Sequence, residues 1–315
     1  MDVIWYNEKE NSALNHNYID GKCECGEIEF KKPTLFIENG VSYVFFGKYP
    51  QTVETNLEVI ASLENISITN SLGYIEYNGN EYIKMIASTW SSSCKFINND
   101  TIIEGATYYF KVEPIKWRVL ESKEGTYTLI SNVILDNPCF YNLKDQSRTV
   151  NGLTIYPNNY EFSNIRAWLN GYNGTSYNVN DYTNKGFIDI AFTYAEMQLI
   201  NSTLVDNSLS STGYTSNPYT CDNTTDKVYL LSYSEATNSK YGLSSSSRLA
   251  QISDFVRAKG IYFKSNYNGN GYWWLRSPLN GYDNIVRSVK YDGSTSNNYV
   301  DENFYGVRPV LNINL

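Results

Sequence analysis

The sequence is 315 residues long, 42% hydrophobic and 18% charged, with a formal net charge of -8 at pH 7. A chain of this length and composition can bury a substantial core. Its acidic balance and lack of clustered Lys and Arg argue against a nucleic acid or an anionic membrane surface as partner. No run approaches the roughly 18–20 apolar residues that a membrane span needs. The opening MDVIW lacks the regions of a signal peptide, so the chain is either not exported by that route or part of a longer protein.

Aromatic residues are abundant, with 29 Tyr, 13 Phe and 6 Trp, whereas there is one His. Tyr, together with the many Asn residues, supplies contact area and adaptable hydrogen bonds, which suits a recognition surface. An AT-rich genome, whose codons favour Asn, Tyr, Ile and Lys, is the alternative cause. The five cysteines are odd in number and have no framework spacing, so we expect no disulfide among Cys94, Cys139 and Cys221.

Residues 1–40 are polar and turn-rich, and we interpret them as an appendage or linker that precedes one globular domain at 41–315. The segment HNYIDGKCECG holds His16, Cys23 and Cys25, three soft ligands that Zn²⁺ accepts. A closed structural zinc site takes four ligands, so we expect a linker with two free thiols and keep zinc as the alternative.

Most elements expected at the N-terminal end of the domain are strands. VSYVFFGKYP (41–50) reads as a strand that enters a turn, and GYIEYNGNEYIKMIA (73–87) reads as a hairpin because Asn78-Gly79 suits a tight turn. Between them, NLEVIASLEN (56–65) predicts a helix behind an Asn56 cap. The runs 108–121 and 126–136 are rich in β-branched and aromatic residues, which predicts a second, longer hairpin.

Helices are expected in the middle of the chain, at 163–171 with Ser163 as cap and Gly171 as stop, at 187–200 and at 245–260. Residues 201–225 read as a loop. Strands return in the tail, where we expect YWWLRSP (272–278) and YGVRPVLNI (305–313) to be neighbours in one sheet. Strands at both ends and helices between them indicate an α+β domain.

Six motifs follow one another along roughly residues 44–315: FGKYPQT (46–52), PIKWRVL (114–120), SNIRAWLNG (163–171), VYLLSYSEA (228–236), YWWLRSP (272–278) and GVRPVLNI (306–313). In this order they resemble an uncharacterised bacterial domain family marked by WLRSP and GVRP runs and found in large proteins of Firmicutes and spirochaetes. The last fifty residues are also similar to the end of formylglycine-generating-enzyme-like domains. That second resemblance implies a C-type-lectin-like fold, and neither resemblance implies a reaction.

Several arginines and tryptophans stand alone among apolar residues, a pattern typical of a buried stem whose polar end is paired with carbonyl or carboxylate groups. We interpret these residues as structural, and the alternative is an aromatic platform for a sugar beside a cationic donor. The set comprises Trp117, Arg118, Arg166, Trp168, Trp274, Arg276 and Arg308.

The polar tail between the last strands carries the candidate ligand-binding residues. Their oxygen atoms could hold Ca²⁺, although the spacing is not that of an EF-hand loop and sugar-binding calcium signatures are missing. A solvated hairpin loop is the alternative. These residues are Asp283, Asp292, Asn297, Asn298 and Asp301.

No catalytic residue is predicted, because the single His lies in the N-terminal segment and leaves the domain without a base for a Ser-His-Asp or Cys-His arrangement. We therefore expect a non-enzymatic module that binds a glycan or protein at a bacterial cell surface or on a phage or secreted particle. It needs no cofactor, with Ca²⁺ or Zn²⁺ as the alternatives. Two other functions stay open: a structural or assembly spacer in a larger chain, and a glycoside hydrolase with paired carboxylates.

Overall fold

The computed structural model describes residues 18–19, 22–23, 32–263 and 267–315, and the chain divides into two compact units, 1–33 and 34–315. In the first unit, strands β1 (Tyr18–Ile19) and β2 (Lys22–Cys23) form an antiparallel pair. Among the candidate zinc ligands, His16 and Cys25 lie outside the described residues, and Cys23 is described only by its backbone. The second unit begins ahead of the boundary expected at residue 40, because residues 35–38 already belong to its sheet.

The second unit is built around an eight-stranded antiparallel sheet, which with the short helices confirms the predicted α+β class. Its strands are β3 (Leu35–Glu38), β4 (Val41–Val53), β5 (Ile75–Tyr77), β6 (Asn80–Ile86), β7 (Thr107–Lys123), β8 (Thr126–Ser131), β13 (Val228–Tyr229) and β17 (Val310–Asn314). They lie in the order β13, β17, β8, β7, β4 and β3, while β6 pairs with β7 and β5 with β6. Both predicted hairpins are confirmed, as β5–β6 and β7–β8.

Strand β4 does not enter a turn at Lys48–Pro50, as the sequence had suggested, but continues for 13 residues. Its register against β7 shifts twice, between Phe45 and Lys48 and between Pro50 and Thr52. The first shift contains Gly47, whose φ of +65° is a conformation that glycine adopts without strain. A bulge therefore takes the place of the predicted turn.

A second, three-stranded sheet consists of β14 (Trp273–Pro278), β15 (Ile285–Val289) and β16 (Thr295–Tyr299). The expectation that YWWLRSP and YGVRPVLNI are neighbours in one sheet is wrong, because β14 and β17 belong to different sheets. The two motifs meet instead through a parallel bridge between Trp273 and Gly306. Part of the polar tail pairs with β15 as β16.

Two of the expected helices are confirmed together with their caps. Helix α2 (Leu57–Glu64) begins at Asn56, whose side chain accepts from the backbone N–H groups of Glu58 and Val59. Helix α3 (Asn164–Asn170) begins at Ser163 and ends at Gly171, which is left-handed with φ +66°.

The other two expected helices are each split in two. Residues 187–200 form α4 (Phe187–Ala191) and α5 (Tyr194–Leu199), because Phe192 is extended and Thr193 caps a new helix. Residues 245–260 form α8 (Ser245–Arg248) and α9 (Asp254–Ala258), which begins at the Ser253 cap. Between α8 and α9 the chain is extended, and Ile252 bridges to Ile134.

The segment 201–225 is not a plain loop, since it holds a strand, a short helix and part of a second strand. The remaining elements are β9 (Arg148–Val150), β10 (Leu153–Ile155), η1 (Thr175–Tyr177), β11 (Thr203–Val205), α6 (Leu209–Thr212), β12 (Thr224–Asp226), α7 (Tyr233–Thr237) and η2 (Ser239–Tyr241). Strand β9 pairs with β10, and β11 pairs with β12.

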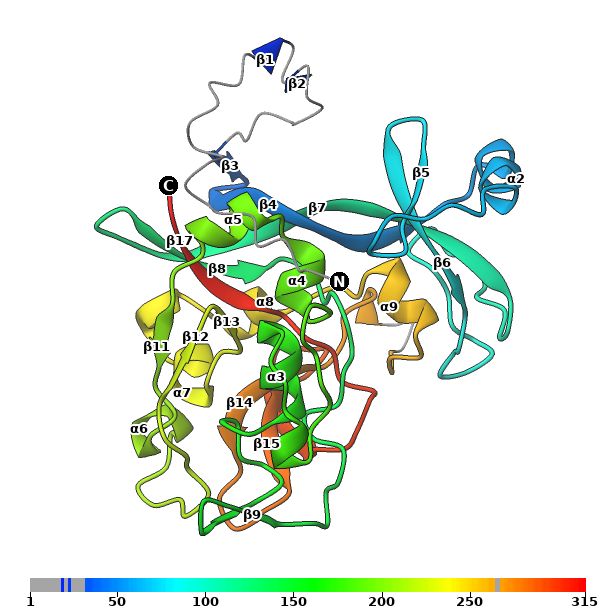
Figure 1. Cartoon of the computed structure of the whole chain (residues 1–315). Coiled ribbons are helices and arrows are strands. Elements are labelled where there is room, and N and C mark those ends of the chain that lie inside the picture. The colour runs from blue at the N-terminus through cyan, green and yellow to red at the C-terminus, as the bar shows by residue number, and fades with distance from the viewer. Residues whose placement is uncertain (1–17, 20–21, 24–31, 264–266) are drawn as a thin grey trace, which may run out of the picture. The chain divides into compact units, whose positions relative to one another are not determined.

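The main core lies between the large sheet and the elements beneath it, and Figure 1 shows β14, β15 and α3 below the long strands β4 and β7. Its largest side chains include Trp117, Trp273 and Trp274, each at most 1% exposed. Cys94, Cys139 and Cys221 are free, as predicted. Within the described ranges, no helix is long and apolar enough to cross a membrane.

Candidate functional site: a hollow around helix α3

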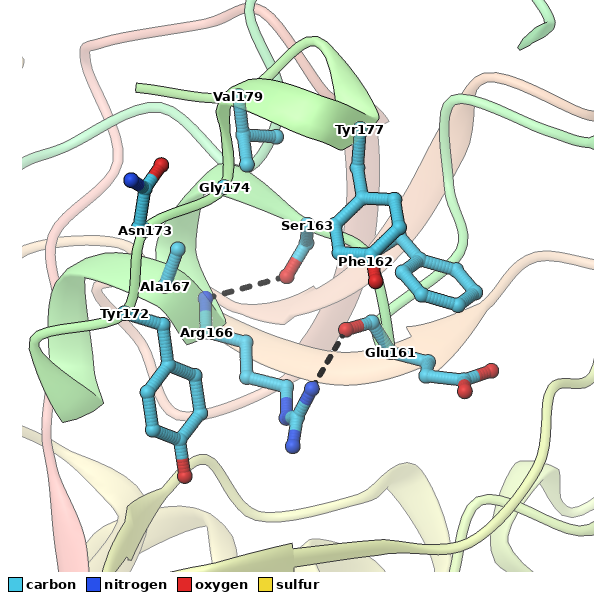
Figure 2. Close-up of a pocket in the computed structure, with 10 residues that line it drawn as sticks. All are labelled: Glu161, Phe162, Ser163, Arg166, Ala167, Tyr172, Asn173, Gly174, Tyr177 and Val179. Atoms are coloured by element: carbon cyan, nitrogen blue, oxygen red, sulfur yellow. Dashed lines mark hydrogen bonds between the residues drawn. The ribbon is translucent and has the colours of Figure 1, made fainter. Parts of the chain in front are cut away.

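Helix α3 positions the side chains that line a surface hollow of about 140 Å³ (Figure 2). The Ser163 hydroxyl accepts from the Arg166 backbone N–H at 3.1 Å, which fixes the first turn. The residues that precede and follow α3 in the sequence also line the hollow. Those that follow can do so because the left-handed conformation of Gly171 reverses the chain at the end of the helix. The lining comprises Glu161, Phe162, Ser163, Arg166, Ala167, Tyr172, Asn173, Gly174, Tyr177 and Val179.

Arg166 is the central polar group of this hollow. Its Nε donates to Asp226 Oδ1 at 2.8 Å, and its Nη1 donates to the Glu161 carbonyl at 2.7 Å. Burial opposes the charged form of Arg166, but the charge and hydrogen bond of Asp226 together with the Tyr160 and Tyr172 side chains outweigh burial and raise the Arg166 pKa. Nη2 has no hydrogen-bond partner among the described residues and is not sealed from solvent. The guanidinium is therefore fixed in place with donor capacity to spare.

Aromatic rings flank this guanidinium. The Tyr172 ring centre lies 5.2 Å from Arg166 Cζ, and Tyr172 is 38% exposed. The rings of Phe162 and Tyr177 pack against each other with centres 4.6 Å apart. Figure 2 shows Tyr172 on one side of the Arg166 side chain, and Phe162 and Tyr177 on the other.

A second hollow, of about 320 Å³, adjoins the first and shares Glu161 and Phe162 with it. The β9–β10 hairpin and residues 220–222 line its other sides. Burial, then the charge of Asp222, raise the Glu161 pKa, although the Asp222 backbone N–H bonds this carboxyl group. Burial also raises the pKa of Cys221 to about 11, so its thiol stays protonated at neutral pH. Together the hollows form an aromatic and polar depression with one fixed cation and two acids.

Of the seven residues interpreted as structural, only Arg166 lines this site. The tryptophans pack inside the core: Trp168 lies against Phe187 with ring centres 5.5 Å apart, and Trp274 lies against Tyr305 at 4.4 Å. The Trp117 Nε1 donates to a backbone carbonyl at 2.7 Å.

The other three arginines bond backbone carbonyls elsewhere in the domain. Arg276 donates to the Leu230 and Asp206 carbonyls and to the Glu235 carboxylate. Arg118 and Arg308 donate to carbonyls only.

The candidate ligand residues of the tail have local partners and are not gathered into one site. Asp292 accepts from Ser294 within its turn, and Asp301 pairs with Lys144 at 3.3 Å. Asn297 and Asn298 lie on β16 opposite β15, while the Asp283 carbonyl accepts from a backbone N–H. Among residues 32–263 and 267–315, no three His, Cys, Asp or Glu side chains come close enough to hold a metal ion.

Sequence reasoning missed Glu161, Phe162, Tyr172 and Tyr177 as site residues. The usable signal was local: a capped helix with one lone arginine, preceded by Glu-Phe and followed by the Tyr-, Asn- and Gly-rich run GYNGTSYN. The partner that orients Arg166 is Asp226, 60 residues away, and nothing in the helix indicates it.

Comparison with known proteins gives a family match that covers all residues of this site. No curated protein and no solved structure matches the chain. A family model described as a domain of unknown function, DUF6273, matches residues 124–315, which include every residue of both hollows. The chain belongs to this family of uncharacterised domains.

Proposed function

We propose that the protein is a non-enzymatic recognition module that binds a glycan in the hollow around α3. The observation that carries the proposal is the Arg166 guanidinium, held by Asp226 and Glu161 with one nitrogen unbonded, between an exposed tyrosine and the Phe162–Tyr177 pair. Sugar rings present apolar faces that pack on aromatic rings, and hydroxyl groups at their edges that bond charged and amide side chains. The hollow offers both kinds of contact.

The place of action and the finer fold belong to the same proposal. The resemblance of the motifs favours a bacterial cell surface, a phage particle or a secreted particle. A C-type-lectin-like arrangement is supported by the bridge between Trp273 and Gly306, which brings the two closing motifs together. A protein ligand would use the same aromatic and polar groups.

A glycan array followed by calorimetric titration of the best ligand tests this function. Tyr172→Ala and Tyr177→Ala should each weaken binding at least about fivefold, because stacking and packing contacts of this kind are worth about 1–3 kcal/mol. Tyr282→Ala is the matched control, since Tyr282 is 55% exposed and lines neither hollow. If the array is blank, or the control loses as much affinity as the two variants, the spacer function is favoured.

One observation favours a second function, a glycoside hydrolase with paired carboxylates. Glu161 has a raised pKa beside Asp222 in a single hollow, which is the environment of a general acid that acts with a second carboxylate. Chromogenic glycosides test it. Hydrolysis by the native chain that is lost in Glu161→Gln, while sugar binding is retained, would replace the recognition module by an enzyme.

A further inference from the structure

Two arginines outside the α3 hollow, Arg118 of β7 and Arg308 just before β17, are held next to each other. Arg118 Nη1 donates to the Ser247 carbonyl at 3.2 Å, and Arg308 Nη1 donates to the carbonyl of the next residue, Arg248, at 3.3 Å. Arg308 Nε also donates to the Ser131 carbonyl at 3.0 Å. Because they bond consecutive carbonyls of one segment, the two guanidinium groups are neighbours.

Neither arginine has a carboxylate partner among the described residues, unlike Arg166 and Arg276. Arg308 is only 2% exposed. Burial first, and the neighbouring positive charge of Arg118 second, lower the Arg308 pKa to about 9. A buried cation beside a like charge is costly unless an anion compensates it, and backbone carbonyls carry only partial charge.

Each arginine keeps one nitrogen that no described protein group bonds. The Nη2 atom of both residues has no hydrogen bond within the described part of the chain and is not completely sealed from solvent, whereas Arg118 Nε is both unbonded and sealed. The Trp273 ring, 5.0 Å from Arg308 Cζ, covers one face of that group. The open donors therefore belong to one pair of adjacent guanidinium edges.

The strands beside the pair carry one further ion pair, which adds no net charge. Tyr43 of β4 lies opposite Arg118 in the register, and the Lys116 ammonium lies 4.3 Å from the Tyr43 ring centre. Lys116 is paired with Glu38, so its charge is already compensated. The two arginine charges are the ones left without a carboxylate partner among the described residues.

We propose that the Arg118–Arg308 pair binds a small oxyanion, a phosphate or sulfate group that is either a free ion or part of a larger ligand. Guanidinium edges present parallel N–H donors that match two oxygens of such a group. The anion would compensate the buried Arg308 charge and occupy the donors that protein groups leave open. This site is separate from the α3 hollow, whose lining includes neither arginine.

Thermal unfolding of the full chain in increasing inorganic phosphate or sulfate, with chloride at equal ionic strength as reference, tests the proposal. The native protein should show a saturable rise in Tm, of the size expected when an anion binds the folded state alone. Arg118→Gln should abolish the rise and Arg118→Lys should keep part of it. Without phosphate, Arg118→Gln should melt no lower than the native chain, because it removes the repulsion on Arg308.

The control is Arg287→Gln, which should leave the phosphate response unchanged. Arg287 contacts the Tyr214 and Tyr233 rings and has no ion pair in the described part of the chain. A flat response of the native chain, or an equal rise in Arg118→Gln, overturns the proposal. A sulfated oligosaccharide distinguishes the two sources: binding at least about tenfold tighter than inorganic sulfate assigns the anion to a larger ligand, and equal binding assigns it to a free ion. Tyr177→Ala should leave the anion response intact, so this test stands apart from that of the glycan site.

Discussion

Arg276 and Glu235, 41 residues apart in the sequence, form a bidentate ion pair, with Nη1–Oε2 at 2.5 Å and Nη2–Oε1 at 2.9 Å. Glu235 also accepts from the Ser232 backbone N–H at 2.7 Å and thereby caps helix α7. One carboxylate thus fixes both the buried arginine of the WLRSP motif and the helix that follows strand β13.

Arg276→Ala should lower the free energy of unfolding by about 3–5 kcal/mol, because the Arg276 side chain is 1% exposed and its loss leaves the Glu235 carboxylate without its ion partner and removes the donor to two carbonyls. Urea denaturation measures the change. Arg287→Ala is the control and should cost about 1 kcal/mol, since Arg287 has ring contacts and a bond to the Tyr214 hydroxyl but no ion pair among the described residues. Equal costs for the two variants would contradict the structural role of Arg276.

Acid should weaken the domain through Glu235. Burial raises the pKa of this carboxyl group, but the Arg276 charge and hydrogen bonds outweigh burial and lower it below the usual 4.5. A carboxyl group with a lowered folded pKa stabilises the fold above its unfolded pKa, and this contribution is lost as the pH falls through the folded value. The stability difference between the native chain and Glu235→Gln should therefore shrink below pH 4.5 in urea melts taken across this range. A difference that is constant with pH would contradict the assignment.

Gly47→Ala should be strongly destabilising. An added Cβ would lie 2.5 Å from the Phe192 ring and 2.6 Å from the Ala191 carbonyl, at a φ of +65°. Gly125→Ala is the control, because its φ is +81° and nothing lies within 4 Å of its Cβ. We expect about 1–2 kcal/mol of backbone strain in both variants and about 1–3 kcal/mol more at Gly47 from the clash, measured by denaturant melts. Equal losses would mean that the β4 bulge has room for a side chain.

Strand β3 should contribute to the stability of the domain although its residues are mostly exposed. Its Phe36 ring stacks on Phe45 at 5.0 Å and on Tyr43 at 5.8 Å, and Glu38 pairs with Lys116. A chain that starts at residue 41 should therefore melt a few degrees below one that starts at residue 34, as a loss of about 1–2 kcal/mol produces in a large domain. Identical Tm values in calorimetry would show that β3 adds nothing.

The tail should tolerate substitution. Asp292→Ala should change the free energy of unfolding by less than about 0.5 kcal/mol, because its side chain bonds only Ser294 within the same turn. Asn298→Ala should cost about 0.5–1.5 kcal/mol, because the Asn298 side chain bonds the Tyr305 side chain as well as the neighbouring Tyr299 N–H. Both should also keep the glycan affinity of the native chain if the ligand binds around α3. A loss of affinity with full stability would instead move the ligand site to the tail.

Local signals in the sequence predicted individual elements well. Asn78-Gly79 marked the β5–β6 turn, and Ser163 and Gly171 marked both ends of α3, because caps and tight turns depend on nearby residues alone. The same signals would have split the predicted helix at 187–200, since Thr193 and Glu196 form a capping box inside it.

Contacts between distant residues were not predictable. Strand β14 pairs with β15, whereas β17 pairs with β8 and β13, but both motifs read simply as apolar strands and carry no sign of their partners. The candidate site depends on Asp226 reaching Arg166 from β12. Such pairings follow from the topology as a whole, so the motif could indicate a buried arginine but not the hollow around it.

The position of β17 has a consequence for how the domain forms during synthesis. This strand, at residues 310–314, lies between β13 and β8 inside the large sheet and pairs residue by residue with 126–130. Neither neighbour can complete its ladder until residues 310–314 have left the ribosome, so β8 keeps an open edge from the synthesis of residue 131 until then. Such late, long-range pairing slows folding, and exposed edges are where growing chains associate. Chaperone dependence of the yield is therefore expected to follow translation speed across the last strand more than the stability of the finished domain.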